Sequence, residues 1–356
     1  IGSAAVATGY VAPAAFAPFG TAAKAASNRP AVGLRAPAVS SMASLRSSPL
    51  ASRSSFATTL RVSNEAEMDS ALNQIRMGLK PGQKPVVIGL AADSGCGKST
   101  FMRRVTACFG GESKLLPIGR ETNTLVSEDT TVICLDDFHL NDRAGRKVSG
   151  LTALDPRENN FDLMYQVVKD LKDGKTVTKP IYNHVNGTLD EPEEIKPTPI
   201  IIFEGLHPFH DDRVNELMDF RIYVDITPEV KFNWKVQRDH EERGHSIESI
   251  KESIEARKPD FDAHIDPQKN KADCVIQVLP TDLAKDDKKT LKVEMIQVKD
   301  VPNFTPTYLM DEGSDIEWTP AKDKLKVSAP GMKIYQRMDK WAGKDAVVVG
   351  MDGKYD

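Results

Sequence analysis

Residues 92–100 carry the pattern of a phosphate-binding loop. In order, the loop consists of Ala92, Asp93, Ser94, Gly95, Cys96, Gly97, Lys98, Ser99 and Thr100. An apolar run typical of a buried strand precedes the loop and a helical pattern follows it, which is the context that this motif requires. The loop amides and the positive helix end would cradle phosphate oxygens, Lys98 would reach the outer phosphates, and the hydroxyl of Ser99 would bind Mg²⁺. The loop therefore predicts a nucleoside triphosphate site.

Two carboxylates come directly after other buried strands. Asp136 follows the apolar run 132–135, and Glu204 follows the run 200–203. Because the carboxyl ends of parallel strands share one edge of a sheet, we expect both side chains beside the phosphate-binding loop. Phosphoryl transfer needs a base for the acceptor hydroxyl and a metal ligand, so Asp136 is the candidate base and Glu204 the candidate Mg²⁺ ligand. The alternative is that each carboxylate only caps a helix or pairs with a cation.

Basic side chains could hold a charged acceptor or the phosphates in transfer. His139 and Arg143 follow the candidate base closely in the sequence. Lys235 and Arg238, together with Asp239, fall on one face of a predicted helix. A charged helix face is often only solvated, so that interpretation stays open for the second group.

Five near-continuous apolar runs separated by helical stretches predict a mostly parallel sheet that is buried on both faces. They span residues 86–91, 132–135, 200–203, 221–225 and 274–278. One helix would be capped by Thr227 and end at Gly244, and another would run from Ser246 to Ala256. After about residue 284, alternating apolar positions predict antiparallel strands. The expected fold class is α/β, with a core over residues 65–283 and a strand-rich extension of the same domain over 284–356.

The overall composition excludes several classes of function. The 356 residues carry a net charge of −4, which gives no electrostatic footprint for nucleic acid. No apolar run approaches the roughly 18 residues that a membrane span needs, so no membrane partner is expected. The four cysteines include no C-x-x-C pair, which argues against a structural zinc site and for a reducing or redox-variable compartment.

The first 64 residues differ sharply from the rest. They contain no Asp or Glu, six Lys or Arg, and many Ala, Ser and Pro. This acid-poor composition is typical of an organelle transit peptide, a segment that does not belong to the fold. An ordinary disordered tail is the alternative. The phenylalanine-containing stretch 14–18 resembles the cleavage motif that precedes transit peptides of secondary plastids.

The tetrapeptide 270–273, Asn-Lys-Ala-Asp, matches the guanine-reading motif of GTPase switches. In those proteins a buried strand precedes the motif, whereas here the polar run 266–269 precedes it and the strand follows. The strand ends also carry Asp136 and Glu204 in sequences that lack the D-x-x-G pattern of such switches. We therefore interpret 270–273 as a surface turn, and the pattern favours a small-molecule kinase over a switch.

Together these motifs resemble the phosphoribulokinase family of oxygenic phototrophs, of the plant and algal type. The matching stretches are 91–101, 132–139, 179–184, 203–208, 235–239, 242–246 and 256–262, within a resemblance that covers about residues 84 to 356. The resemblance implies the P-loop nucleoside-triphosphate hydrolase/kinase fold. It also implies phosphorylation of the 1-hydroxyl of D-ribulose 5-phosphate by ATP with Mg²⁺, giving ribulose 1,5-bisphosphate in the plastid stroma.

The same resemblance implies roles for individual residues. Asp136 would be the catalytic base and Glu204 would bind the metal with Ser99. Lys98, Lys235 and Arg238 would act on the phosphates in transfer. The residues that would bind ribulose 5-phosphate are His139, Arg143, Tyr182, Arg238 and Arg243.

A regulatory role for Cys96 also follows from the resemblance. In plant-type enzymes the loop cysteine pairs with one just before the catalytic Asp, here Cys134, and thioredoxin reduces the bridge. Such a bridge would block the phosphate cradle and displace Asp136. A thiol at a helix N-terminus is also expected to have a lowered pKa, which favours thiol exchange. The alternative is that Cys96 and Cys134 are two unpaired buried thiols. We expect Cys108 and Cys274 to be core thiols with no regulatory role.

The chain departs from the family pattern in its later part. Ala321 and Val327 stand where plant-type enzymes carry a second cysteine pair. This puts in doubt a second disulfide and the inhibitory assembly with glyceraldehyde-3-phosphate dehydrogenase through a small disordered linker protein. A homodimer is expected. The chain begins at Ile1 and stops at Asp356, where the family continues, so we read it as a fragment at both ends.

Two other functions stay open at this stage. A kinase resembling uridine or pantothenate kinase shares the loop and a strand-end carboxylate, but its acceptor carries no phosphate. For such an acceptor the cations Arg143, Lys235 and Arg238 would be superfluous. The other candidate is a redox-responsive nucleotide-binding scaffold with little catalysis of its own.

Overall fold

The computed structural model describes residues 83–353, apart from 94, 99–100, 103–104, 107–113, 116–123, 237–239, 241–245, 285–288, 303 and 319–330. The chain divides into two units, Ile1–Ala71 and Leu72–Asp356, and every described residue belongs to the second. The predicted transit segment over residues 1–64 therefore lies outside the described residues. So do Ala321 and Val327.

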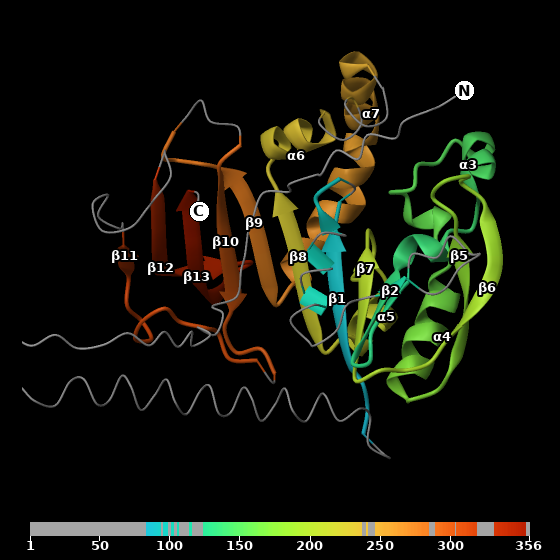
Figure 1. Ribbon diagram of the computed structural model, residues 1–356, viewed down its shortest axis with the longest axis horizontal. Coiled ribbons are helices and arrows are strands. Elements are labelled where there is room, and N and C mark those ends of the chain that lie inside the picture. The colour runs from blue at the N-terminus through green and yellow to red at the C-terminus, as the bar shows by residue number, and fades with distance from the viewer. Residues whose placement is uncertain are drawn as a thin grey trace, which may run out of the picture. The chain divides into compact units, whose positions relative to one another are not determined.

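One large sheet forms the centre of the second unit (Figure 1). Its parallel strands lie in the order β9, β8, β1, β7 and β4. Their bounds are β1 Val86–Ala92, β4 Thr130–Cys134, β7 Ile200–Gly205, β8 Phe220–Ile226 and β9 Cys274–Pro280. All five predicted apolar runs are thus strands of one parallel sheet, and the α/β fold class is confirmed.

Apolar side chains cover both faces of this parallel sheet. Val87 and Ala91 of β1 belong to one buried cluster, and Leu90 and Ala92 belong to another. This division follows from the alternation of side chains along a strand, and it explains why the strands have near-continuous apolar sequences. On the first face, α4 (Phe161–Lys172) buries Met164, Val167, Val168 and Leu171. The shorter helix α5 (Asp212–Leu217) packs beside α4.

Antiparallel strands extend the sheet at both edges. Beyond β9 lie β10 (Leu291–Val298), β13 (Lys344–Gly353), β12 (Met332–Trp341) and β11 (Ile316–Trp318). The alternating apolar pattern predicted this extension. At the opposite edge, beyond β4, lie the two short strands β3 (Leu125–Val126) and β2 (Lys114–Leu115). These two strands had not been predicted.

Two helices follow β8, and the first of them lies at the carboxyl end of that strand (Figure 1). The first, α6 (Pro228–Lys235), begins after Thr227 as predicted, but the Thr227 side chain makes no capping hydrogen bond. The predicted end of that helix at Gly244 lies outside the described residues. The second, α7 (Ile247–Asp260), is capped by the Ser246 side chain, which accepts a hydrogen bond from Ser249 N at 3.1 Å.

The predicted end of α7 at Ala256 is wrong, because the helix continues through Pro259 to Asp260. A π-helical turn, η4 (Phe261–Ile265), then continues the chain. Ile265 is fully buried beside Leu154 and Leu206, so packing holds this turn against the core despite the proline. The 3₁₀ segment η5 (Asp266–Lys271) leads into β9.

The tetrapeptide 270–273 has a structural role in this fold. It lies before β9, as predicted, and Asp273 Oδ2 accepts hydrogen bonds from Arg221 N at 2.9 Å and Arg221 Nη1 at 3.2 Å. The aspartate therefore ties β8 to the start of β9.

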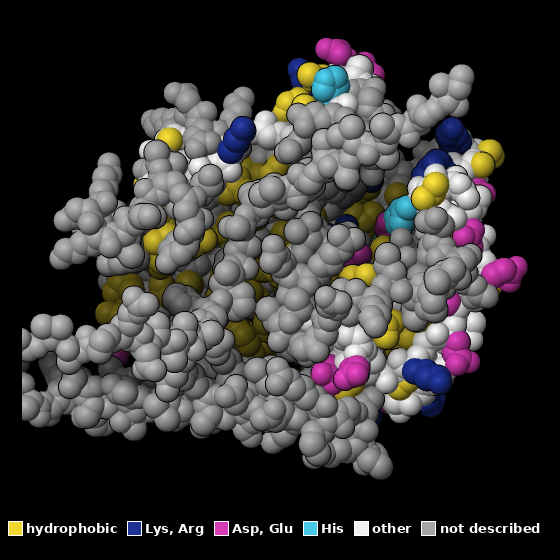
Figure 2. All heavy atoms as spheres, in the orientation of Figure 1, with side chains coloured by type: hydrophobic (Ala, Val, Ile, Leu, Met, Phe, Trp, Pro, Cys, Tyr) yellow, Lys and Arg dark blue, Asp and Glu magenta, His cyan; other side chains and the backbone are white. Residues whose placement is uncertain are grey.

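A second, two-stranded sheet stands apart from the large one. It consists of β5 (Val177–Tyr182) and β6 (Leu189–Ile195), which are antiparallel. Between β4 and this hairpin lie η1 (Leu135–Phe138), α3 (Arg143–Ser149), η2 (Pro156–Glu158) and α4. Basic and acidic side chains are interspersed over this part of the molecule (Figure 2). Among the described residues, no helix is long and apolar enough to cross a membrane.

The loop after β7 holds a buried histidine. Gln268 fixes the loop, because its Nε2 donates to Leu206 O at 2.7 Å and its Oε1 accepts from Phe209 N at 2.9 Å. Between these points, His207 is 1% exposed. Burial, assisted by the positive fields of His210, His264 and His139, lowers the pKa of His207 to about 3.

This shift predicts a loss of stability at mildly acidic pH. Below about pH 6.5, His207 binds a proton in the unfolded state. In the folded state it becomes protonated only near its pKa of about 3. As the pH falls across that window, protonation of His207 in the unfolded state lowers the free energy of unfolding by about 1.4 kcal/mol per pH unit. Urea unfolding between pH 4 and 7 should show this slope in the native chain, and His207→Gln should remove it.

The test is the difference in unfolding free energy between the native chain and His207→Gln at each pH. The slope of the native chain alone is not enough, because His139 and His210 also have lowered pKa values. A difference in unfolding free energy that does not change with pH would contradict the assignment.

Candidate active site

The strand register aligns the three parts of the site. Glu204 of β7 is paired in register with Leu90 of β1 on one side and with Cys134 of β4 on the other. The phosphate-binding loop follows β1 directly, and Asp136 lies in η1 directly after β4. As predicted, both carboxylates therefore lie at the carboxyl edge of the sheet, with Glu204 between the loop and the candidate base.

The described part of the loop has the backbone that phosphate binding requires. Gly95 and Gly97 have φ angles of 83° and 77°, which favour glycine because a Cβ would be strained there. The helix begins at once, since Phe101 N donates to Gly97 O at 2.9 Å. Ser94, Ser99 and Thr100 lie outside the described residues. The loop thus presents its amides at a helix N-terminus, where an anion is stabilised.

Lys98 and Glu204 form a largely buried charged pair in the site. Lys98 Nζ lies 3.9 Å from Glu204 Oε2. Burial alone would lower the pKa of Lys98, but the negative field of Glu204, with smaller contributions from Cys96, Asp136 and Cys134, raises it above its ordinary value. Burial raises the pKa of Glu204, and Lys98 only partly offsets this.

Glu204 also fits a role as a metal ligand. Its Oε2 is buried and has no hydrogen-bond partner among the described residues. A carboxylate oxygen of this kind is the ligand type that Mg²⁺ prefers. The unsatisfied oxygen next to the phosphate-binding loop therefore suits a Mg²⁺ ion held with the triphosphate.

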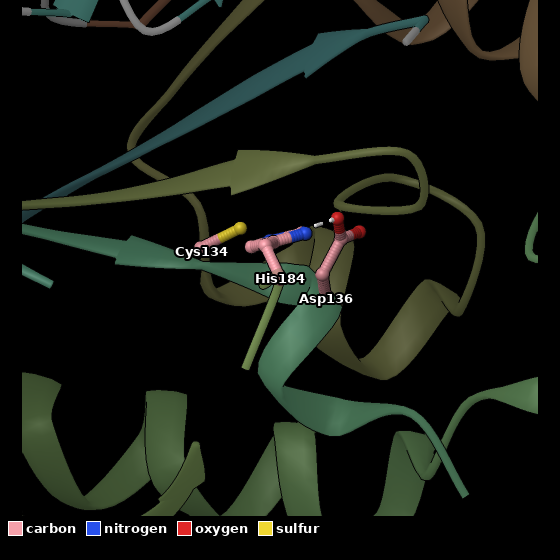
Figure 3. Close-up of side chains that lie close together, drawn as sticks. All are labelled: Cys134, Asp136 and His184. Carbon is pink, nitrogen blue, oxygen red and sulfur yellow. Dashed lines mark ion pairs between the residues drawn. The ribbon is translucent and has the colours of Figure 1, made fainter. Parts of the chain in front are cut away.

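Asp136 is an ionised carboxylate between two histidines. Its Oδ1 lies 3.8 Å from His139 Nε2, and its Oδ2 lies 3.6 Å from His184 Nε2 (Figure 3). Burial would raise the pKa of Asp136, but His139, Lys98, His184 and Arg146 together lower it below its ordinary value. The carboxylate therefore stays deprotonated near neutral pH and can accept a proton.

Tyr182 lies between the same two histidines. Its ring meets His139 and His184 edge-on, at centroid distances of 5.3 and 5.1 Å. Its hydroxyl accepts a hydrogen bond from Arg146 Nη2 at 2.5 Å. The structure thus brings the predicted residues His139 and Tyr182 together around Asp136.

Sequence reasoning missed Arg146 and His184 in this group. Arg146 could have been found, because it lies one helical turn after Arg143 on α3. Arg143 itself lies close by, and its Nη2 donates to His184 O at 2.9 Å while its backbone N donates to Gly187 O at 2.7 Å. These bonds join α3 to the loop between β5 and β6.

A buried ionic network fixes the hairpin to η1, the turn that carries the candidate base Asp136. Lys179 Nζ of β5 lies 2.5 Å from Asp137 Oδ2 and 2.7 Å from Glu193 Oε1, and the lysine is fully buried. Asp137 Oδ1 also accepts a hydrogen bond from Tyr182 N at 2.8 Å. This network places Tyr182 and the following loop beside Asp136.

The two regulatory cysteine candidates are free, buried thiols. Both act electrostatically on the same ammonium, that of Lys98. Burial raises the pKa of Cys96 to about 11 and that of Cys134 well above its ordinary value. The expected lowering of the Cys96 pKa is therefore wrong, because desolvation outweighs the helix end and Lys98. Cys274 is a free core thiol, as predicted, and Cys108 lies outside the described residues.

The predicted cation helix is described only in part. Lys235 is 5% exposed at the end of α6, so it does not belong to a merely solvated face. Arg238, Asp239 and Arg243 lie outside the described residues.

Helix α6 also contacts the phosphate-binding loop, which the sequence did not reveal. Lys231 Nζ forms an ion pair with Asp93 Oδ2. A Cβ on Gly97 would lie 3.5 Å from Trp234 Cζ3. These two contacts hold α6 over both ends of the loop.

Known proteins are similar to this chain over much of its length. The family described as Phosphoribulokinase / Uridine kinase family matches residues 87–285. Chloroplastic phosphoribulokinase of Spinacia oleracea is 61% identical over 277 residues, which are 77% of this chain and 69% of the relative. That of Chlamydomonas reinhardtii is 60% identical over 275 residues, 77% of this chain and 73% of the relative. Uridine kinase of Ligilactobacillus salivarius is 32% identical over 195 residues, 54% of this chain and 85% of the relative.

The contact of α6 with the loop predicts an effect on nucleotide binding. Lys231→Met should raise the KM for ATP about tenfold, because about 1.4 kcal/mol of loop positioning is lost with the Lys231–Asp93 ion pair. Lys231→Arg should restore most of the affinity, and steady-state kinetics with varied ATP measures both.

Lys258→Met is the matched control, because Lys258 pairs with Asp262 on an exposed part of the chain. Equal KM values for the native chain and Lys231→Met would show that the ion pair does not position the loop.

Proposed function

Because the chain belongs to the phosphoribulokinase and uridine kinase family, we propose that it transfers the γ-phosphoryl group of ATP to the 1-hydroxyl of D-ribulose 5-phosphate. The product is ribulose 1,5-bisphosphate, and the reaction is a step of the Calvin–Benson cycle. The choice of acceptor is supported by 61% identity with a phosphoribulokinase, against 32% with a uridine kinase over a shorter match. The chain is thus a phosphotransferase with a sugar phosphate as acceptor.

The observation that carries this proposal is the convergence of Asp136, Lys98 and Glu204 at one edge of the sheet. The aspartate is ionised, and it lies in a group of side chains that can hold an acceptor. Lys98 stays protonated beside the loop that would hold the phosphates. An acceptor and a triphosphate bound here would therefore meet between a base and a fixed positive charge, which is what phosphoryl transfer requires.

Different residues would bind the phosphates, accept the proton and stabilise the negative charge. The amides of residues 92–100 and the ammonium of Lys98 would hold the β- and γ-phosphates in place. Asp136 would accept the proton of the 1-hydroxyl as the oxygen attacks the γ-phosphorus. Lys98, Lys235 and Arg238 would stabilise the negative charge on the group in transfer.

Ser99 and Glu204 would hold the Mg²⁺ ion that accompanies ATP. When bound, the ion neutralises charge on the phosphate oxygens. Glu204 contributes a buried carboxylate oxygen with no competing hydrogen bond in the described part of the chain.

The acceptor would be held by His139, Arg143, Tyr182, Arg238 and Arg243. Arg146 joins this group, because it donates to Tyr182 and acts on Asp136. Two arginines on α3 give the acceptor side the positive charge that a sugar phosphate needs and uridine does not.

We also propose that the Cys96 and Cys134 thiols form a regulatory disulfide that thioredoxin reduces. Both thiols act electrostatically on Lys98. Cys96 lies in the phosphate-binding loop after β1, and Cys134 is the last residue of β4. Because both are buried in the reduced state, oxidation requires the loop to open. The proposed location is the plastid stroma, and a homodimer is the proposed assembly. The inhibitory complex with glyceraldehyde-3-phosphate dehydrogenase stays in doubt, since Ala321 and Val327 replace the second cysteine pair.

The acceptor assay tests the main proposal. With ATP and Mg²⁺, ribulose 5-phosphate should be phosphorylated far faster than uridine or pantothenate, and Asp136→Asn should lower kcat by about two to four orders of magnitude through loss of the base. Initial rates with each acceptor give the comparison.

Asp162→Asn is the matched control, because the Asp162 side chain is 87% exposed. Comparable rates with uridine would overturn the choice of acceptor. Full activity in Asp136→Asn would instead favour a nucleotide-binding scaffold with chemistry located elsewhere.

The redox proposal has a separate test. Oxidation should lower the activity of the native chain reversibly, and Cys134→Ser should be insensitive because the bridge cannot form. Activity is measured after incubation with oxidised and then reduced dithiothreitol.

Cys274→Ser, which changes another buried free thiol, should respond to oxidation like the native chain. Reversible oxidative loss of activity in Cys134→Ser would rule out the proposed bridge.

A further inference from the structure

Three side chains of different chemistry converge at the end of β4. The thiol of Cys134, the carboxylate of Asp136 and the imidazole of His184 each offer one ligand atom, and these atoms lie within 4.8 Å of one another. Figure 3 shows the imidazole lying between the thiol and the carboxylate. The phosphoryl transfer proposed above uses the carboxylate alone as a base, so the convergence of all three has no role in it.

The kind of donor indicates the kind of ligand. Mg²⁺ prefers oxygen donors, whereas a set of one sulfur, one nitrogen and one oxygen suits Zn²⁺ and related borderline-soft ions. We propose that Cys134, Asp136 and His184 form a binding site for a thiophilic divalent cation of the zinc class, and that the bound cation inhibits phosphoryl transfer.

The distances suit a tetrahedral ion after a small movement. Metal–ligand bonds of about 2.0 to 2.3 Å place the ligand atoms of such a site about 3.3 to 3.6 Å apart. His184 Nε2 and Asp136 Oδ2 are already 3.6 Å apart. The Cys134 thiol has to approach by about 1 Å at most, relative to the 4.8 Å limit of the cluster.

His184 provides the way in for a cation. Its side chain is 48% exposed, whereas Cys134 is 6% exposed. The imidazole lies in the loop after β5, where Asn183 Oδ1 accepts hydrogen bonds from Val185 N and Asn186 N at 2.9 and 3.1 Å. A cation arriving from solvent would thus meet His184 first and the thiol last.

The charge around the thiol also favours a cation. The carboxylates of Glu204, Asp136 and Asp137 all act on Cys134, against the single ammonium of Lys98. Asp137 is paired with Lys179 and Glu204 with Lys98, so Asp136 supplies the negative charge that a cation at the thiol would meet. On binding, the Cys134 thiol passes its proton to water and the resulting thiolate bonds to the metal, so each cation releases one proton.

Inhibition follows from the choice of ligands. A carboxylate oxygen of Asp136 that is bonded to a metal cannot accept the proton of the acceptor hydroxyl. The site shares no ligand with the Mg²⁺ site proposed at Ser99 and Glu204, so excess Mg²⁺ should not displace the inhibitory cation.

Direct binding to the reduced chain, without ATP or acceptor, tests the site. Zn²⁺ is titrated in competition with a chromophoric indicator, and Co²⁺ is used as a probe for a thiolate-to-metal charge-transfer band. We expect a single tight equivalent in the native chain, and binding weaker on the order of 100-fold in Cys134→Ser and in His184→Gln. The Co²⁺ band should be absent in Cys134→Ser.

Two matched controls separate this site from other thiols and histidines. Cys274→Ser and His210→Gln should bind Zn²⁺ like the native chain, since both residues lie outside the cluster. Zn²⁺ should also raise the melting temperature of these controls and of the native chain, which shows binding to the folded form. Equal affinity in the native chain and His184→Gln, or a Co²⁺ thiolate band that persists in Cys134→Ser, would overturn the site.

An activity measurement tests the inhibition by itself. With millimolar Mg²⁺ present, micromolar Zn²⁺ should inhibit the native chain, and His184→Gln should need on the order of 100-fold more. Equal sensitivity of the two proteins would overturn the inhibitory role. Because the binding titration needs no turnover, its result does not depend on which acceptor the enzyme uses.

Discussion

The ammonium of Lys98 is the charge on which the candidate site depends. It lies 3.9 Å from the Glu204 carboxylate and helps keep the half-buried Asp136 ionised. A buried anion is costly unless a cation compensates it, so two carboxylates at adjacent strand ends require this lysine. The phosphate-binding loop therefore stabilises the empty site with the same positive charge that it offers to phosphates.

Both buried thiols belong to the same electrostatic group. Cys96 and Cys134 act on Lys98, and Glu204 in turn acts on both of them. A chemical change at either sulfur, by the proposed oxidation or metal binding, would alter the field at Asp136, the candidate base. The proposed regulation and the proposed catalysis would therefore act through one small group of charges.

Sequence patterns predicted the parallel strands and the two strand-end carboxylates, because these depend on local apolar runs and on a general rule of α/β sheets. They did not predict the ion pair of Lys231 with Asp93 or that of Lys179 with Asp137, because no periodicity links residues so distant in the chain. They also gave the wrong direction for the pKa of Cys96. The helix end is visible in the sequence, whereas the depth of burial is set by the whole fold.

The hairpin of β5 and β6 forms a sheet of its own, yet it supplies Tyr182 and His184 to the site. The proposed triphosphate site would rest on the large sheet, whereas much of the proposed acceptor site would rest on this hairpin and on α3. Mutations in the hairpin would therefore change which alcohol is accepted while the triphosphate site stays intact.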